Sequence, residues 1–198
     1  MKLLGSSRSP YVQKVRIALV EKGLPFEYEE SSPASDEVMV GNPLAKIPTL
    51  IRDDGRGLYD SCVIVEYIDS VDGAPMLIPP DFESRIEVRR WEALGDGVTD
   101  ALVAIAHENR APVEQRRGPD YFARFERKID AGLKAMEQGL GAKPFCFGDK
   151  ITLADVACAS ALLYLDRSMP DLNWRQKHPV LAKHYAKLQE RPSMKALA

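Results

Sequence analysis

The 198-residue sequence predicts two parts of different fold class, a small α/β part at the N-terminus and a longer part made only of helices. In the first part, short apolar or alternating runs are separated by helical patterns and turn signals, which is typical of strands and helices that share one sheet. In the second part, the apolar patterns have helical spacing. A segment rich in proline separates the two parts.

The first part begins as strand, helix and strand. Residues 1–4 form a short apolar run, and the polar residues 5–9 end it as a turn. Pro10 suits the first turn of a helix, where its missing N–H costs nothing, and residues 12–19 place apolar side chains on one helical face. Residues 26–29 alternate apolar and acidic side chains, as a half-buried strand does. Because this is a βαβ unit, we expect its two strands to be parallel.

A hairpin and a further helix complete the first part. Residues 42–51 hold two prolines followed by a β-branched run, and residues 53–55 (Asp-Asp-Gly) predict a hairpin turn. Residues 57–60 then form an antiparallel strand, and Ser61 is predicted to cap the helix that follows. The order β-α-β and then β-β-α is that of the thioredoxin-like fold. We therefore predict an α/β thioredoxin-like domain over residues 1–74.

The rest of the chain is predicted to be an all-α domain. Residues 72–81 form the most linker-like stretch. We place the linker at residues 75–82 and the helical domain at residues 83–198. Residues 153–165 are apolar on nearly every side, which predicts a helix buried at the domain centre. Two further helices show apolar stripes, formed by Trp91, Leu94, Val98, Ala101, Leu102 and Ile105 and by Phe122, Phe125, Ile129, Leu133, Met136 and Leu140.

The start of the buried helix carries a capping signal. Thr152 can accept a hydrogen bond from the backbone N–H three residues on, while Asp155 reaches back, which is a capping box with Asp in place of Glu. We interpret Thr152 and Asp155 as structural, and we expect substitutions there to cost about 1–2 kcal/mol of stability.

Composition excludes several classes of protein. Lys plus Arg is 27 and Asp plus Glu is 29, so no excess of positive charge favours nucleic acid or an anionic membrane as partner. No apolar run approaches the roughly 20 residues of a membrane-spanning helix, and the first residues resemble no signal peptide. The three cysteines, Cys62, Cys146 and Cys158, show neither metal-ligand spacing nor a disulfide framework. We therefore expect a cytoplasmic protein without a metal.

Three motifs, in order and over nearly the whole chain, resemble the cytosolic glutathione transferase superfamily, in its bacterial form with a serine at the N-terminal turn. The first is the Ser-Pro that opens the first helix, within residues 8–19. The second is formed by residues 42–48, with their two prolines, and by residues 60–61. The third is the capping segment, residues 148–155. Short motifs match by chance, so the identification depends on their joint spacing.

The resemblance implies a catalytic role for Ser9. Family members activate the glutathione thiol as thiolate, and serine- and cysteine-type members place the residue that contacts the sulfur at this turn. A free thiol has a pKa near 8.5. A hydrogen bond to the charged sulfur contributes about 1.5–3 kcal/mol, which corresponds to a pKa lower by roughly one to two units. The alternative reading of Ser9 is a simple N-cap, and Ser7 is the second candidate for the sulfur contact. Leu4 and Gly5 stand where tyrosine-type members carry tyrosine.

The resemblance also implies a set of residues that bind the rest of glutathione. Ile47 and Pro48 resemble the corner where a cis X-Pro bond lets the backbone pair with the cysteinyl part of the peptide, whereas the alternative is an ordinary trans proline at a strand start. Asp60 and Ser61 would hold the γ-glutamyl end, with the Ser61 N–H at a helix N-terminus suited to a carboxylate. Lys46 could reach the glycyl carboxylate, or it could be an exposed lysine.

The second substrate and the assembly are less constrained. Tyr11 and His107 are candidates to line the second-substrate pocket, although a lone His on a helix is more often a surface or packing residue. The resemblance implies a homodimer with a role in detoxification, in which Asp96 and Asp100, one helical turn apart, could contact the partner's glutathione.

Three reactions remain open for such an enzyme: conjugation to a small electrophile, reductive removal of a leaving group, and isomerisation. Isomerase-type relatives carry Ser-Ser-Cys where this chain has Ser9, Pro10 and Tyr11, which disfavours that assignment. A non-catalytic interaction module of the same fold is the alternative from another class. A thioredoxin-type oxidoreductase is contradicted by the absence of C-x-x-C.

Overall fold

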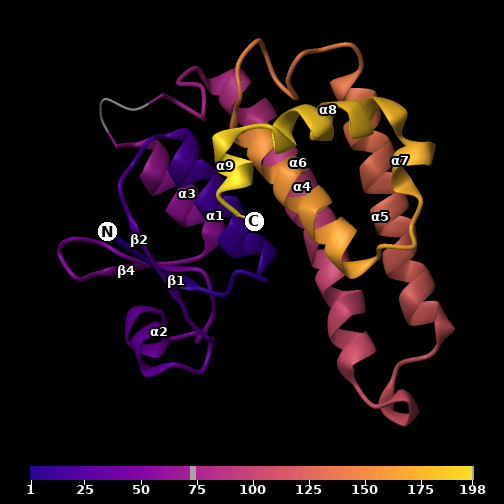
Figure 1. Cartoon of the computed structure of the whole chain (residues 1–198), viewed down its shortest axis with the longest axis horizontal. Coiled ribbons are helices and arrows are strands. Elements are labelled where there is room, and N and C mark those ends of the chain that lie inside the picture. Colours follow the sequence, from indigo (N-terminus) through magenta and orange to yellow (C-terminus); the bar gives the residue numbers. More distant parts are fainter. Residues whose placement is uncertain (72–74, 198) are drawn as a thin grey trace. The chain divides into compact units, whose positions relative to one another are not determined.

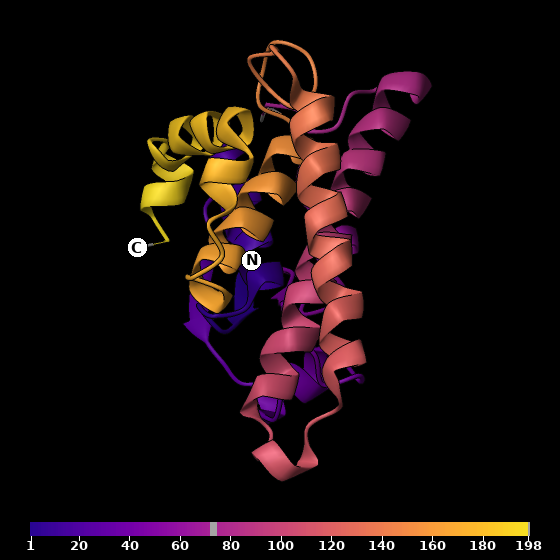
Figure 2. The same ribbon diagram turned by 90° about the vertical axis from the view of Figure 1, so that its right-hand side faces the viewer.

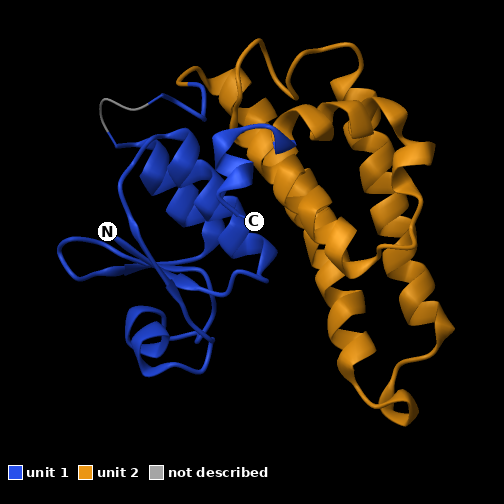
Figure 3. Ribbon diagram, in the orientation of Figure 1, with its two compact units in different colours: residues 1–79, 189–198 blue, residues 80–188 orange. Residues whose placement is uncertain are grey.

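The computed structural model describes residues 1–71 and 75–197. The chain divides into two compact units, shown in different colours in Figure 3. Unit 1 consists of residues 1–79 and 189–198, and unit 2 of residues 80–188. Unit 1 is a mixed α/β unit and unit 2 is all-helical, so the predicted fold class is confirmed.

Unit 1 is built on a four-stranded sheet (Figure 1). Its strands are β1 (Lys2–Gly5), β2 (Glu27–Glu30), β3 (Thr49–Ile51) and β4 (Gly57–Leu58), in the order β2-β1-β3-β4. The first strand pairs in parallel with β2, as the βαβ pattern predicted, and antiparallel with β3. The β3–β4 pair is the predicted antiparallel hairpin.

Helices pack on this sheet and complete the core of unit 1. They are α1 (Pro10–Glu21), α2 (Asp36–Gly41), α3 (Ser61–Asp69) and α9 (Pro192–Lys195). The longest of these, α1, packs against α3 and α9. The core between helices and sheet consists of fully buried aliphatic side chains, among them Leu3, Leu4, Val15, Leu19, Leu50, Ile64 and Ile68. The sequence analysis did not predict α2, because this short helix buries only Val38 and has no apolar stripe.

Residues 75–79 of the predicted linker belong to unit 1, and residues 80–82 to unit 2. Leu77 and Ile78 are buried, and their backbone N–H groups donate to the Asp69 carboxylate at 2.6 and 3.1 Å. Lys22 forms a buried ion pair with the same carboxylate at 3.3 Å. Pro79 and Pro80 therefore follow a well-anchored segment, and residues 72–74 of the predicted stretch lie outside the described residues.

The last residues of the chain also belong to unit 1, whereas the sequence analysis assigned them to the helical domain. Glu21, at the end of α1, pairs with Arg191 at 2.7 Å and accepts from the Ser193 hydroxyl. Arg16 donates to the Ala196 carbonyl at 2.9 Å. These contacts between residues far apart in sequence are absent from any local pattern, so the boundary could not be predicted.

Unit 2 is a bundle in which α4 and α5 run antiparallel and α6 packs along α4 (Figure 2). Its elements are α4 (Phe82–Arg110), a 3-10 turn (Val113–Gln115), α5 (Pro119–Leu140), α6 (Leu153–Ser168), α7 (Trp174–Lys177) and α8 (Pro179–Gln189). Gly95 lets α4 approach α6 closely, because a Cβ there would lie 2.9 Å from the Ala157 Cβ. The predicted central helix is α6, which is buried on nearly all sides.

The predicted capping box at the start of α6 is confirmed. The Asp155 carboxylate accepts from the Thr152 N–H at 2.9 Å and from the Thr152 hydroxyl at 3.2 Å. The other Asp155 oxygen accepts from the Cys146 N–H at 2.8 Å and lies 3.2 Å from His184 Nε2. Asp155 is thus a buried hub that ties a loop and α8 to α6, which is more than the sequence predicted.

Within the described ranges, each helix is either too short or too polar to cross a lipid bilayer.

Candidate functional site

The turn between β1 and α1 presents Ser9 at the N-terminus of α1. Ser9 is the N-cap residue, with extended backbone angles, and its hydroxyl oxygen lies 3.4 Å from the Val12 N–H, from which it accepts. Its own N–H donates to the Ser6 carbonyl at 2.9 Å, which closes the turn. A serine hydroxyl that accepts one bond can still donate its own proton. The half-exposed Ser9 side chain therefore offers a donor at the positive end of a helix dipole.

A carboxylate from β2 holds this turn in place. The Ser7 N–H donates to the two Glu30 oxygens at 3.1 and 2.9 Å, and the Tyr28 hydroxyl donates to Glu30 at 2.6 Å. The hydrogen bond from Tyr28, with the one from Ser7, lowers the pKa of Glu30 to about 2. Burial and the same bond raise the pKa of Tyr28. Glu30 is thus an ionised anchor for the backbone that leads to Ser9.

Two residues of α1, Gln13 and Val12, also contact the turn between β1 and α1 or the glycine before it. The buried Gln13 side chain donates to the Ser7 carbonyl, so α1 and β2 both bind the backbone of Ser7, one at its C=O and the other at its N–H. Gly5 ends β1 where a Cβ would lie 2.4 Å from Val12 Cγ2. A larger residue at position 5 would collide with α1, and Leu4 is fully buried. Neither Leu4 nor Gly5 carries a hydroxyl, so these two positions supply no tyrosine-type sulfur contact.

The peptide bond between Ile47 and Pro48 is cis, as the sequence predicted. Asn42 organises the loop before it: its side-chain amide donates to the Lys46 carbonyl at 2.9 Å, and its side-chain oxygen accepts from the Leu44 N–H at 3.0 Å. The Lys46 side chain itself is exposed. The loop is therefore shaped by a buried asparagine, while the lysine points to solvent.

The start of α3 differs in one respect from the prediction. Asp60, not Ser61, is the N-cap of α3, because its carboxylate accepts from the Cys62 N–H at 2.9 Å. Ser61 is the first helical residue and is buried, whereas Asp60 is exposed. The backbone N–H groups of a first helical turn have no intrahelical partner, so this end can accept a carboxylate.

The sheet topology brings these segments to one end of unit 1. The register places Gly5 beside Glu30 and Leu4 beside Thr49, and β4 runs parallel to β1, so the start of α3 follows at the same end. Ile47 lies next to Gly5, since its Cβ is 3.5 Å from a Cβ built on that glycine. One end of the sheet is thus surrounded by segments distant in sequence, namely residues 9, 46–48 and 60–61. An extended peptide could pair with the backbone there.

The remaining predicted residues lie elsewhere. Tyr11 is half-exposed on α1 in unit 1, and His107 is exposed near the end of α4 in unit 2. Asp96 and Asp100 lie one turn apart on α4, as predicted, with Asp100 exposed. That Tyr11 and His107 line the second-substrate pocket stays a prediction. The same holds for a contact of the two aspartates with the partner's glutathione in a dimer.

Unit 2 contains a cavity of about 330 Å³ between α5 and the segment that includes α7. It is lined by Ile129, Leu133, Met169, Leu172 and Trp174, with charged side chains and His178 around them. None of the predicted site residues lines it. No local sequence pattern indicates this cavity, because packing between segments about 40 residues apart forms it.

The sequence analysis missed the residues that position the site, namely Gln13, Glu30 and Asn42. The sequence contained a signal for Glu30, because parallel pairing of the first two strands places the end of β2 beside the turn that carries Ser9. For Gln13 and Asn42 the signal was only burial of an amide side chain, which composition does not reveal.

Comparisons with known proteins show the family of this chain. Residues 8–71 match the family model "Glutathione S-transferase, N-terminal domain", and residues 119–187 match "Glutathione S-transferase, C-terminal domain". The chain is 36% identical to the GST-like protein YibF of Escherichia coli K12, over 98% of this chain and 96% of that protein. It is 28% identical to rat maleylacetoacetate isomerase, over 84% of this chain and 78% of the isomerase.

A solved structure is closer in sequence. The glutathione S-transferase of Methylobacillus flagellatus KT, crystallised with glutathione bound, is 43% identical to this chain, with a TM-score of 0.95. The alignment covers 100% of this chain and 98% of that one. Both units of the chain, and the motifs at one end of its sheet, therefore identify it as a member of the glutathione S-transferase superfamily.

Proposed function

We propose that this chain binds glutathione at the end of the sheet surrounded by residues 9, 46–48 and 60–61. We further propose that Ser9 stabilises the glutathione thiolate for attack on a small electrophile. The observation that carries the proposal is the position of Ser9. Its hydroxyl sits at the N-terminus of α1, accepts one weak bond from Val12, and keeps its proton for a ligand.

The expected effect of Ser9 is large enough for catalysis. One hydrogen bond to a charged sulfur, at about 1.5–3 kcal/mol, lowers a thiol pKa by roughly one to two units from about 8.5. The helix terminus adds to this stabilisation. Together they make thiolate the main form near neutral pH, and a thiolate is the nucleophile that an electrophile requires.

The other residues are proposed to hold the tripeptide. The Ile47 backbone before Pro48 would pair with the cysteinyl part, and Ser61 with its N–H would bind the γ-glutamyl carboxylate while Asp60 binds the ammonium. Lys46, which is exposed at the same end of the sheet, would form an ion pair with the glycyl carboxylate. We propose that unit 1 forms this glutathione-binding domain and that unit 2 shapes the second-substrate pocket.

The test compares Ser9→Ala with Ser7→Ala, a matched loss of a hydroxyl in the same turn. In Ser9→Ala, the pKa of bound glutathione, followed by thiolate absorbance, should rise by roughly one to two units and turnover should fall. The affinity for glutathione should change little, because the remaining contacts hold the peptide. An unchanged titration in Ser9→Ala together with a raised pKa in Ser7→Ala would transfer the role to Ser7.

Glutathione-dependent isomerisation is a second candidate activity, favoured by the similarity to rat maleylacetoacetate isomerase. The residues at the turn, Ser9, Pro10 and Tyr11, differ from the Ser-Ser-Cys expected of that class. Incubation with maleylacetoacetate distinguishes the two: isomerisation would convert it without consuming glutathione. A panel of electrophiles tested alongside would support conjugation if glutathione is consumed.

A non-catalytic interaction module remains the alternative from another class. Retention on immobilised glutathione, with elution by free glutathione, would argue against it.

We also propose a cytoplasmic homodimer, with Asp96 and Asp100 near the partner's glutathione. Sedimentation that shows a stable monomer at micromolar concentration would contradict the dimer without affecting the proposed role of Ser9.

A further inference from the structure

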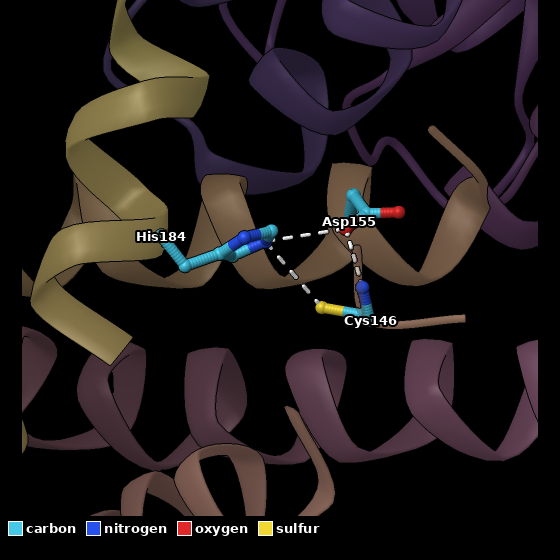
Figure 4. Close-up of side chains that lie close together, drawn as sticks. All are labelled: Cys146, Asp155 and His184. Carbon is cyan, nitrogen blue, oxygen red and sulfur yellow. Dashed lines mark hydrogen bonds and ion pairs between the residues drawn. The ribbon is translucent and has the colours of Figure 1, made fainter. Parts of the chain in front are cut away.

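Three side chains from separate segments of unit 2 meet in its interior: Cys146, Asp155 and His184 (Figure 4). Cys146 comes from the loop before α6, Asp155 from the first turn of α6, and His184 from the middle of α8. All three are buried, with relative exposures of 0%, 0% and 5%. The sequence analysis saw no metal-ligand spacing among the cysteines, because the partners of Cys146 are 9 and 38 residues away.

We propose that Cys146, Asp155 and His184 bind a divalent metal ion of the zinc type. Thiolate, imidazole and carboxylate are the ligands that Zn²⁺ takes in proteins. The three ligand atoms lie within 4.8 Å of one another. His184 Nε2 lies 3.2 Å from the nearer Asp155 oxygen and 3.7 Å from Cys146 Sγ.

The two separations from His184 Nε2 fit a tetrahedral ion, and the third, between Cys146 Sγ and the Asp155 oxygen, is at most 4.8 Å. With Zn–N and Zn–O bonds of about 2.0–2.2 Å and a Zn–S bond of about 2.3 Å, tetrahedral angles place neighbouring ligand atoms roughly 3.2–3.7 Å apart. Binding would therefore require small side-chain shifts and no rebuilding of the backbone. In the metal-free protein the same atoms form hydrogen bonds, in which a proton takes the place of the ion.

The groups around the cluster would orient the ligands. Thr152 donates its N–H and its hydroxyl to the second Asp155 oxygen, at 2.9 and 3.2 Å, and the Cys146 N–H donates to the first at 2.8 Å. Hydrogen bonds of this kind to a ligating carboxylate fix its orientation in metal sites. The capping box therefore doubles as the support of the proposed site.

Cys158 is the candidate for the fourth ligand, although its side chain would have to turn toward the cluster, since its sulfur is not among the ligand atoms that lie within 4.8 Å of one another. It is fully buried on α6, three residues after Asp155, so the two side chains lie on the same face of the helix. Its thiol donates to the sulfur of Met136 at 3.9 Å. A closed set of four protein ligands without access for a substrate is typical of a structural zinc site. The ion would join the loop, α6 and α8.

The test uses the full chain, stripped with a chelator and titrated with Co²⁺ and then Zn²⁺. We expect one Co²⁺ per chain, with the thiolate-to-cobalt charge-transfer band that cysteine ligation produces, displacement by Zn²⁺, and a higher melting temperature with Zn²⁺. Absence of stoichiometric Co²⁺ uptake at micromolar protein would overturn the proposal.

Variants separate the metal site from the hydrogen-bond network. Cys146→Ser keeps a hydroxyl that can hydrogen-bond with His184, so the fold should survive, but the metal affinity should fall at least about 100-fold with loss of the band. A band that persists in folded Cys146→Ser would contradict the site. His178→Gln is the matched control, since His178 is a buried histidine paired with Glu137 at 3.0 Å outside the cluster, and it should bind metal as the natural protein does.

Cys158→Ser should weaken binding at least about tenfold, and unchanged affinity would remove Cys158 from the ligand set.

Discussion

Helices α1 and α6 begin in similar ways but in different surroundings. Each opens with a hydroxyl residue at the N-cap, Ser9 or Thr152, and at each a carboxylate from Glu30 or Asp155 binds nearby backbone N–H groups. At α1 the hydroxyl is half-exposed and the carboxylate is at the surface. At α6 the capping residues are buried, and Asp155 is fully so.

This difference in burial explains the different roles that we assign. At the exposed end, the hydroxyl retains a donor that a ligand can use, and the carboxylate only steadies the turn. At the buried end, each polar group must find a partner inside the protein, because an unsatisfied buried group costs about 1–3 kcal/mol. The same capping chemistry therefore serves binding at α1 and stability at α6.

The largest expected effect is on stability, from Asp155→Ala. The substitution leaves the N–H groups of Cys146 and Thr152 without their acceptor and removes the carboxylate beside His184. Loss of one partner of a buried charged pair costs about 3–5 kcal/mol, more than the 1–2 kcal/mol expected for a cap alone. Urea unfolding followed by tryptophan fluorescence measures it, with the exposed Asp130→Ala as control. A loss below about 1 kcal/mol would refute the hub role of Asp155.

A smaller loss is expected from Thr152→Ala, at about 1 kcal/mol. The variant removes the hydroxyl that donates to Asp155 at 3.2 Å but keeps the backbone N–H bond at 2.9 Å. Thr152→Ser, which retains the hydroxyl, should restore most of the stability in the same unfolding assay. Equal losses for Thr152→Ala and Asp155→Ala would mean that the capping box acts only as a unit.

Glu30→Gln should change how stability depends on pH. The pKa of Glu30 is lowered from about 4.3 in an unfolded chain to about 2 in the folded protein, so its ionised form stabilises the fold above about pH 4.3. This contribution is lost as the pH falls from about 4.3 to 2. Because Glu30 is exposed, we expect at most about 1 kcal/mol. Unfolding at pH 3 and at pH 6 should differ less in Glu30→Gln than in the natural protein, and an equal difference would exclude Glu30 as the ionised anchor.

The smallest loss of stability is expected from Ser9→Ala, at about 0.5 kcal/mol, because the cap bond to Val12 is long at 3.4 Å. The same variant should lose most of its transferase activity. Thermal unfolding without glutathione, together with an activity assay, measures both. A loss of more than about 2 kcal/mol would mean that Ser9 is chiefly a structural cap, like Thr152.

The sequence predicted those features that depend on local patterns. The parallel βαβ unit, the hairpin over residues 49–58, the helix start at Pro10 and the capping box at Thr152 each follow from a few neighbouring residues. The cis bond before Pro48 was predicted through the family resemblance.

The features that were missed depend on contacts between distant segments. Glu30 meets Ser7 across the parallel pair, Glu21 meets Arg191 near the end of the chain, and His184 meets Asp155 from another helix. No spacing rule covers such pairs, because packing alone decides which face of each helix approaches which partner. The N-cap of α3 was placed one residue late, since Asp60 and Ser61 are both good caps and only the backbone geometry decides between them.

The most direct test of the account is the titration of glutathione bound to the natural protein and to Ser9→Ala, followed by thiolate absorbance. We expect a bound thiol pKa below about 7.5 in the natural protein, and a value roughly one to two units higher in the variant at nearly the same glutathione affinity. The same low pKa in both proteins would contradict the claim that the Ser9 hydroxyl stabilises the thiolate.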